Sequence, residues 1–145
     1  MIPVIKILRK IPIAPRRSAF TRWFWERLEQ GVFETTECEA CGKISFPPKQ
    51  VCPRCHSDQF LFKELSGRGV VYTRTRVHMT PTRLIPLAPL SVGIVDLEEG
   101  VRVACTLLDR KVPLQIGDEI QMVSMKFKDG VLFGAQAAIM KGDES

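Results

Sequence analysis

The sequence has no long hydrophobic run. No apolar stretch among its 145 residues approaches the roughly 18–20 residues that a helix needs to cross a bilayer, so no transmembrane helix is expected. The basic N-terminal segment MIPVIKILRKIPIAPRR is interrupted by prolines, and no small-residue cleavage site follows it, so we interpret it as an arm rather than as a signal peptide. These absences predict a cytoplasmic protein, whose paired cysteines more often bind a metal than form disulfides.

The chain is also poor in the residues from which catalytic sites are built. It contains two histidines, His56 and His78, and one tyrosine, Tyr72. A nucleophile–base–carboxylate set would need His78, and no nucleophile elbow accompanies that residue. The stretch Gly67-Arg68-Gly69 lacks the second half of either glycine-rich phosphate-binding motif. The sequence therefore predicts a protein that is not an enzyme.

Acidic residues are missing from one end of the chain. Residues 1–22 contain six basic side chains and no acidic one. The remaining 15 basic residues face 16 acidic ones, so residues 23–145 carry a formal charge of −1, although the whole chain carries +5. Because the positive charge belongs to the arm, the nearly neutral body gives little support to an extended nucleic-acid surface.

Hydrophobic periodicity predicts one helix followed by five strands. Residues 18–31 place apolar side chains at helical spacing and end at a glycine. Strand-like runs follow at 70–79, 91–97, 101–108, 119–127 and 131–139, with turn residues at 98–100 and 128–130. The proline-rich segment 80–90 suits neither a helix nor a central strand. Five short strands with one long proline-rich connection predict a mainly β protein whose C-terminal part is a small OB-type barrel.

Four of the five cysteines form two Cys-x-x-Cys pairs, namely Cys38 with Cys41 and Cys52 with Cys55. Each pair forms a tight knuckle, and four thiolates fill the tetrahedral coordination of zinc with no position left for water. Gly42 and His56 follow the two knuckles, where a left-handed backbone is usual. We predict one structural zinc ion per chain; iron in a rubredoxin-like site and a thiol redox pair are the alternatives.

The segment around the cysteines is too small to have a core of its own, and a structural metal is the usual remedy. The spacer KISFPPKQV is long enough for a hairpin that turns at Pro47-Pro48. The fifth cysteine, Cys105, shares the period-2 face of Val101 and Val103. We interpret Cys105 as a small buried hydrophobic residue.

Alternation in Val70–Met79 predicts two different strand faces. One face holds Val71, Thr73, Thr75, Val77 and Met79 and is expected to be buried. The other holds Tyr72, Arg74, Arg76 and His78 and lies at the mouth of the proline-rich segment. The second face is either a solvated surface or a contact for an anionic ligand or partner.

The predicted helix is unusually rich in aromatic side chains. Trp23, Phe24 and Trp25 are consecutive, and Phe20 precedes them. So much apolar area on a short peripheral element indicates either packing on the protein's own core or burial in a partner or a second copy of the chain.

Several motifs together resemble the domain-of-unknown-function-thirty-five family, over roughly residues 18–139. The matching segments are Cys38-x-x-Cys41-Gly42, Phe46-Pro47-Pro48, Cys52-Pro53-x-Cys55, residues 65–72, Val77-His78, residues 94–102 and Ile116-Gly117-Asp118. The resemblance implies an N-terminal arm and helix at 1–32, a rubredoxin-like zinc ribbon at 33–64 and an acyl-CoA-associated OB fold at 65–145. It further implies a non-catalytic subunit that accompanies thiolases or hydroxymethylglutaryl-CoA synthases.

Three functions from different classes follow from these patterns. The first is an accessory or scaffold protein that associates with a thiolase-type enzyme and helps to enclose acyl-CoA. Tyr72, Arg74, Arg76 and His78 would then meet the CoA phosphates, the Pro81–Pro89 segment would line the pantetheine arm, and Trp23, Phe24 and Trp25 would contact the partner. The second is a nucleic-acid-binding zinc-ribbon protein, which the scarcity of aromatic residues in 66–145 disfavours. The third is a thiol or metal redox protein.

Overall fold

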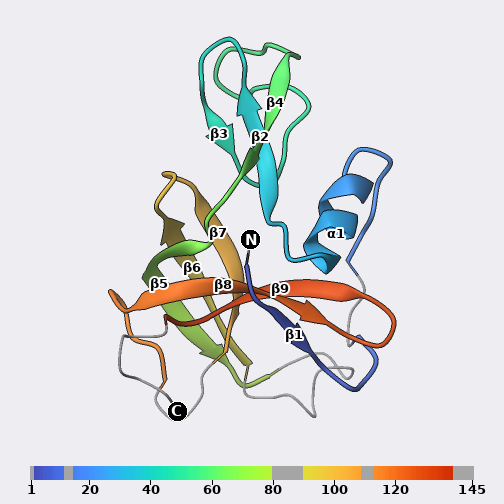
Figure 1. The fold of residues 1–145 in the computed structure, drawn as a ribbon. Helices are drawn as coiled ribbons and strands as arrows, with labels where there is room; N and C mark the ends of the chain where they lie inside the picture. The colour runs from blue at the N-terminus through green and yellow to red at the C-terminus, as the bar shows by residue number, and fades with distance from the viewer. Residues whose placement is uncertain (1, 12–14, 80–89, 109–112, 139–145) are drawn as a thin grey trace.

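The protein is mainly β, with one short helix. The computed structural model describes residues 2–11, 15–79, 90–108 and 113–138 (Figure 1). Its elements are β1 (Val4–Lys6), α1 (Arg22–Glu29), β2 (Glu34–Cys38), β3 (Ile44–Ser45), β4 (Phe60–Glu64), β5 (Arg68–Val77), β6 (Leu90–Leu97), β7 (Arg102–Leu107), β8 (Glu119–Lys126) and β9 (Val131–Ala137). In the described ranges no helix is long and apolar enough to span a membrane.

Five strands close into a barrel, as the sequence predicts. β5 pairs with β6 and β6 with β7, both antiparallel, and β7 then pairs in parallel with β9. β9 pairs with β8, and β8 returns to β5, so the sheet closes on itself. This order, with one parallel pair, is that of the OB fold. The Pro81–Pro89 segment lies outside the described residues.

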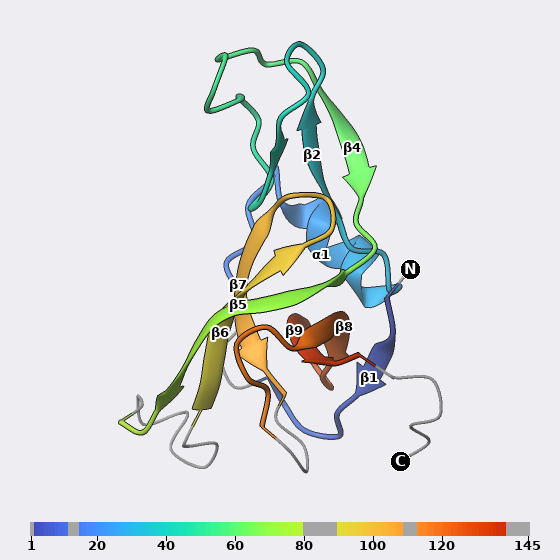
Figure 2. The same ribbon diagram turned by 90° about the vertical axis from the view of Figure 1, so that its left-hand side faces the viewer.

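A separate three-stranded sheet, in the order β3-β2-β4, stands at one end of the barrel (Figures 1 and 2). Helix α1 lies beside the base of β2 and packs against β8 and β9 of the barrel. The small sheet carries the cysteine knuckles, so its place at the end of the barrel positions the metal site.

The N-terminal segment is less independent than an arm. β1 pairs in parallel with β8, with Val4 opposite Ser124 and Lys6 opposite Lys126. β5 covers only residues 119–121 of β8 on that side, and the rest of this edge would otherwise be open. Ile2 is buried and donates its N–H to the carbonyl of Gly31 at 2.7 Å, which ties the segment to the end of α1.

A β-bulge in β5 overturns the predicted faces of this strand. Val71 and Thr73 pair with Val95 and Ile94, which are adjacent in β6, so Tyr72 is an extra residue in β5. An extra residue shifts the alternation by one position, and every side chain beyond it changes face. The prediction that Tyr72 shares a face with Arg74, Arg76 and His78 is therefore wrong.

Four phenylalanines join the helix, the small sheet and the barrel. Phe24 lies in α1, Phe33 precedes β2, Phe46 follows β3 and Phe133 lies in β9. Each ring contacts the other three, with centroid distances from 5.4 to 6.0 Å. We call this cluster the aromatic joint. It shows that Phe24 packs in the protein's own core, where it is 3% exposed, so the expectation that Phe24 contacts a partner is corrected.

Removing a ring from the joint tests its contribution to stability. We expect Phe24→Ala to lower the free energy of unfolding by about 3–5 kcal/mol, because a large buried side chain leaves a cavity that cannot collapse. The matched control is Phe62→Ala, since Phe62 is 57% exposed on β4, and its cost should be about 1 kcal/mol. Denaturant unfolding at equal metal content measures both; equal losses would contradict the account.

Candidate metal centre and its surroundings

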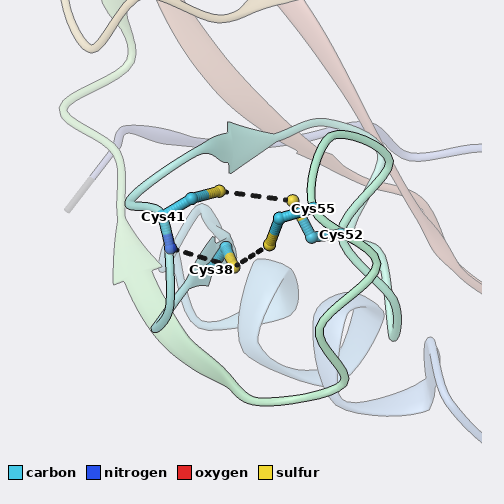
Figure 3. A group of neighbouring side chains, drawn as sticks. All are labelled: Cys38, Cys41, Cys52 and Cys55. Carbon is cyan, nitrogen blue, oxygen red and sulfur yellow. Dashed lines mark hydrogen bonds between the residues drawn. The ribbon is translucent and has the colours of Figure 1, made fainter.

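The four predicted cysteine ligands converge at the far end of the small sheet (Figure 3). Their sulfur atoms all lie within 4.8 Å of one another. The Sγ atoms of Cys38 and Cys55 are 3.4 Å apart, and those of Cys41 and Cys52 are 3.5 Å apart. Cys38 is the last residue of β2, whereas the other three lie in the loops that follow β2 and β3.

The two knuckles have the same backbone geometry. Gly42 has φ of 79° and His56 has φ of 64°, so both adopt the left-handed conformation that the sequence predicts. Gly42 donates its N–H to the carbonyl of Cys38, and His56 donates to that of Cys52, each at 2.9 Å. The N–H groups of Cys41 and Arg54 point at the sulfurs of Cys38 and Cys52, each at 3.4 Å. In each Cys-x-x-Cys pair, this turn points both sulfur atoms toward the centre of the cluster.

Without a bound cation, the cysteine thiols of this cluster differ in pKa. The pKa of Cys41 is lowered to about 6, because the backbone N–H of Lys43 and the side chain of Arg54 donate to its sulfur. The pKa of Cys55 is raised to about 12: the backbone N–H of Ser57 lowers it, but the neighbouring Cys38 sulfur and desolvation outweigh that effect. A metal ion would offset the crowding of four thiolates, so the donor set fits a four-coordinate metal.

The predicted hairpin at Pro47-Pro48 is not formed. β3 pairs back onto β2, with Ser45 opposite Thr36, and β4 covers the other side of β2. The chain after β3 is instead held by the ring of Phe46 in the aromatic joint and by the N–H of Lys49, which donates to the Thr36 hydroxyl at 2.9 Å. The contacts of Phe46 and Lys49 therefore fix the course of the chain after β3.

Cys105 lies apart from this cluster, in β7. Burial raises the pKa of its thiol to about 12, so the sulfur stays protonated near neutral pH. Cys105 packs against the core of the barrel. Cys105 is therefore a small, half-buried hydrophobic residue, somewhat more exposed than predicted.

Because of the bulge, the predicted ligand residues Tyr72, Arg74, Arg76 and His78 lie in different surroundings. Tyr72 is about half exposed, and the guanidinium carbon of Arg102 lies 3.8 Å from its ring centroid. Arg74 pairs with Gly93 and donates to the carbonyl of Leu114 and, at 2.9 Å, to the Ser91 hydroxyl. Arg76 is exposed further along the strand, and His78 is exposed just beyond its end. The structure does not bring the four residues together as one site.

A second aromatic cluster, which we call the aromatic patch, lies between α1 and β4. It comprises Phe20, Trp23, Phe60 and Phe62, with centroid distances of 4.6 to 6.2 Å between neighbouring rings. Phe62 is 57% exposed, and the adjacent Leu61 is also exposed. Sequence reasoning missed this patch, although Phe60 and Phe62 alternate in a strand-like run.

A four-cysteine ribbon joined to an OB barrel defines the class of protein to which the chain belongs. The family model described as "ChsH2, rubredoxin-like zinc ribbon domain" matches residues 25–60, and "ChsH2, C-terminal OB-fold domain" matches residues 62–124. The chain belongs to the DUF35/ChsH2 family, as the sequence motifs predict.

Curated relatives carry two kinds of name. The "DUF35 domain-containing scaffold protein" of Methanocaldococcus jannaschii is 36% identical over 66% of this chain and 72% of the relative. That of Methanothermobacter thermautotrophicus is 32% identical over 74% of this chain and 86% of the relative. "Benzoylsuccinyl-CoA thiolase subunit BbsA" of Thauera aromatica is 29% identical over 63% of this chain and 72% of the relative.

Solved structures show the same architecture. The "Ltp2-ChsH2(DUF35) aldolase" superposes with a TM-score of 0.74 and 25% identity, and covers 86% of this chain and 99% of that one. A DUF35 protein from Sulfolobus solfataricus matches with a TM-score of 0.58 over 83% of this chain and 87% of that one, at 14% identity, which shows the fold alone.

Replacing one knuckle cysteine tests the metal centre. We expect the purified chain to contain one metal ion, and Cys52→Ser to lose most of it together with the native fold of the small sheet, because binding of the metal contributes folding energy there. The matched control is Cys105→Ser, which should retain the metal. Elemental analysis and near-ultraviolet circular dichroism measure the two effects. A metal content that is the same in both variants would contradict the assignment.

Proposed function

We propose that this chain is a non-catalytic scaffold protein that binds a thiolase-type or hydroxymethylglutaryl-CoA-synthase-type enzyme and helps to enclose acyl-CoA. The aromatic patch carries the proposal, because the exposed ring of Phe62 and the half-buried rings of Phe20, Trp23 and Phe60 form one apolar surface suited to a partner. The names of the relatives support the class of partner, since they include scaffold proteins, a thiolase subunit and an aldolase complex.

The metal is zinc in this proposal, and its role is structural. Thiolate sulfurs are soft ligands, and four of them complete the tetrahedral coordination that zinc prefers. The bound ion would hold the loops of the small sheet together. A site with four protein ligands leaves no position for water or substrate, so it gives the chain no metal-assisted hydrolysis.

The remaining chemistry of the described residues supports a non-catalytic role. The Cys105 thiol is held protonated by burial, and so it is a poor nucleophile. His56 serves the turn of the second knuckle, and His78 lies beyond the end of β5. A nucleophile, base and carboxylate would have to lie close together for covalent catalysis.

In this proposal the partner contacts the aromatic patch, which includes Trp23, one of the three residues that the sequence suggested for this role. Trp23 belongs to the patch, and its ring centroid lies 4.6 Å from that of Phe62. Trp25 instead stacks on Phe133 of the barrel, with a centroid distance of 6.2 Å. β4 is an edge strand of the small sheet, so its outer backbone groups border the patch. The exposed ring of Phe62 beside this strand edge offers a partner both apolar area and hydrogen bonds.

Nucleic-acid binding is the weaker alternative. OB folds bind single strands on the outer face of their second and third strands, which are β6 and β7 here, mainly by stacking bases on aromatic rings. The outward residues of these strands include Ile94, Ala104 and Thr106 and no aromatic side chain. Tyr72 is the aromatic residue of the adjoining strand, and Arg102 already covers its ring.

Co-purification tests the proposed function. The tagged chain, expressed in its own organism, should retain an acyl-CoA enzyme, and the chain alone should turn over no acyl-CoA. We expect Phe62→Ala and Trp23→Ala to lower the affinity for that enzyme at least about 10-fold, as truncation of aromatic anchors does. The control is Leu8→Ala, since Leu8 is exposed outside the patch. Recovery of no acyl-CoA enzyme, or equal losses in all three variants, would contradict the proposal.

A further inference from the structure

A shallow cleft of about 250 Å³ lies where the small sheet meets the barrel. Figure 2 shows the turn between β6 and β7 directly below the small sheet. Lys43 and Lys49 line the cleft from the small sheet, and Gly100, Val101 and Arg102 line it from this turn. Three cationic side chains thus border one small space between two parts of the protein.

The two lysines are held in place by their backbones. The carbonyl of Lys43 accepts the N–H of Cys38 at 2.8 Å, and the N–H of Lys49 donates to the Thr36 hydroxyl at 2.9 Å. Within the described part of the chain, neither ammonium group forms an ion pair or a hydrogen bond. Two unpaired cations beside one cleft repel each other, and a bound anion would relieve that repulsion.

Arg102 is held on the barrel side by two contacts. Its Nε atom lies 2.8 Å from a carboxylate oxygen of Asp96, and its guanidinium lies over the ring of Tyr72. A guanidinium has five N–H donors, so the contact with Asp96 leaves others for a ligand. With Asp96 included, the cleft and its border carry a net formal charge of +2.

A second depression, of about 500 Å³, lies further along the barrel, and Ala104 in its lining is two residues along β7 from Arg102 in the lining of the cleft. Its floor is the outer surface of β5, β6 and β7, where most residues are small, apolar or hydroxyl-bearing: Thr73, Thr75, Val92, Gly93, Ile94, Ala104, Cys105 and Thr106. Arg74 also lines it, but its guanidinium donates to the carbonyl of Leu114 and to the Ser91 hydroxyl. Cross-strand pairs continue from Asp96–Arg102 to Ile94–Ala104 and Val92–Thr106. Arg102 therefore stands between the cationic cleft and a largely apolar groove.

We propose that the cleft and the groove together bind one elongated ligand, with a phosphate group at Lys43, Lys49 and Arg102 and an uncharged chain along β5–β7. Ammonium and guanidinium groups suit phosphate oxygens. The groove suits a narrow chain with few charges, since its lining is largely apolar and its threonines supply hydroxyl groups. A CoA ester has both parts; this last identification rests on the proposed function, whereas the phosphate site does not.

Direct titration of the isolated, metal-loaded chain tests the site. We expect CoA to bind more tightly than inorganic pyrophosphate, and pantetheine, which has no phosphate, to bind weakest. Lys43→Gln and Lys49→Gln should each weaken CoA binding about 10-fold, the size of one hydrogen bond to a charged group, and added salt should weaken it further. Ala104→Leu, which narrows the groove, should weaken CoA but leave pyrophosphate unchanged.

Two controls make the outcome decisive. Lys128→Gln makes the same chemical change in the β8–β9 turn, outside both depressions, and should leave CoA binding unchanged. Metal content is measured in each variant, because Lys43 and Lys49 also lie beside Cys38 and Cys52. Loss of metal without any change in CoA affinity would show that the lysines only offset the thiolate charge, and would overturn the proposal.

Titration of the same chain with a single-stranded DNA oligonucleotide, together with the co-purification experiment, separates the remaining outcomes. If single-stranded DNA binds through Lys43 and Lys49 and CoA does not, the small-molecule site is wrong. If the chain retains an acyl-CoA enzyme but binds neither CoA nor pyrophosphate, the phosphate site is wrong and the scaffold function stands. If CoA binds through the lysines but no enzyme is retained, the site stands and the proposed function fails.

Discussion

The contact among four phenylalanine rings is the constraint on which the rest of this structure depends. Phe24 comes from the helix, Phe33 and Phe46 from the barrel-facing end of the small sheet and Phe133 from the barrel, and every pair is in contact. A small sheet that has little core of its own can hold one position on a barrel only through such a shared core. The joint therefore gives the metal centre, the aromatic patch and the cationic cleft fixed positions relative to one another.

The cysteine cluster and the aromatic joint lie at opposite ends of the same small sheet. The four sulfurs gather the loops at the far end, and Phe33 and Phe46 anchor the near end to the barrel. Between these ends the sheet presents β4 and its aromatic side chains on one edge, and Lys43 and Lys49 beside the barrel. A closed metal site and a rigid connection are what a scaffold requires, since both preserve the geometry of its surfaces without taking part in chemistry.

Local patterns in the sequence were enough to predict the metal ligands, the left-handed residues after each knuckle and the five strands of the barrel. Such features depend on spacing and on residue types within a few positions of one another. The bulge at Tyr72 could not be predicted in this way, because the extra residue is identified only by its pairing with β6. The extra residue places Arg74 on the opposite face of β5 from Tyr72, so the predicted face that combined Tyr72 with Arg74, Arg76 and His78 does not exist.

The aromatic joint and the cationic cleft were also beyond sequence reasoning, since each combines residues that lie far apart in the chain. Lys43 and Arg102 meet only because the small sheet packs on the β6–β7 turn, and Phe24 meets Phe133 only in the folded core. The same limit explains why the helix aromatics left two interpretations open. In the structure Phe24 is buried in the core, whereas Trp23 is half-buried and contacts the exposed ring of Phe62.

Amide hydrogen exchange, compared between the isolated chain and its complex with the retained enzyme, tests the scaffold account most directly. The account predicts slower exchange in β4, at Phe60–Glu64, and in the first turn of α1, with no change in the β8–β9 turn. Protection confined to other surfaces, or an exchange pattern that the enzyme leaves unaltered, would contradict it.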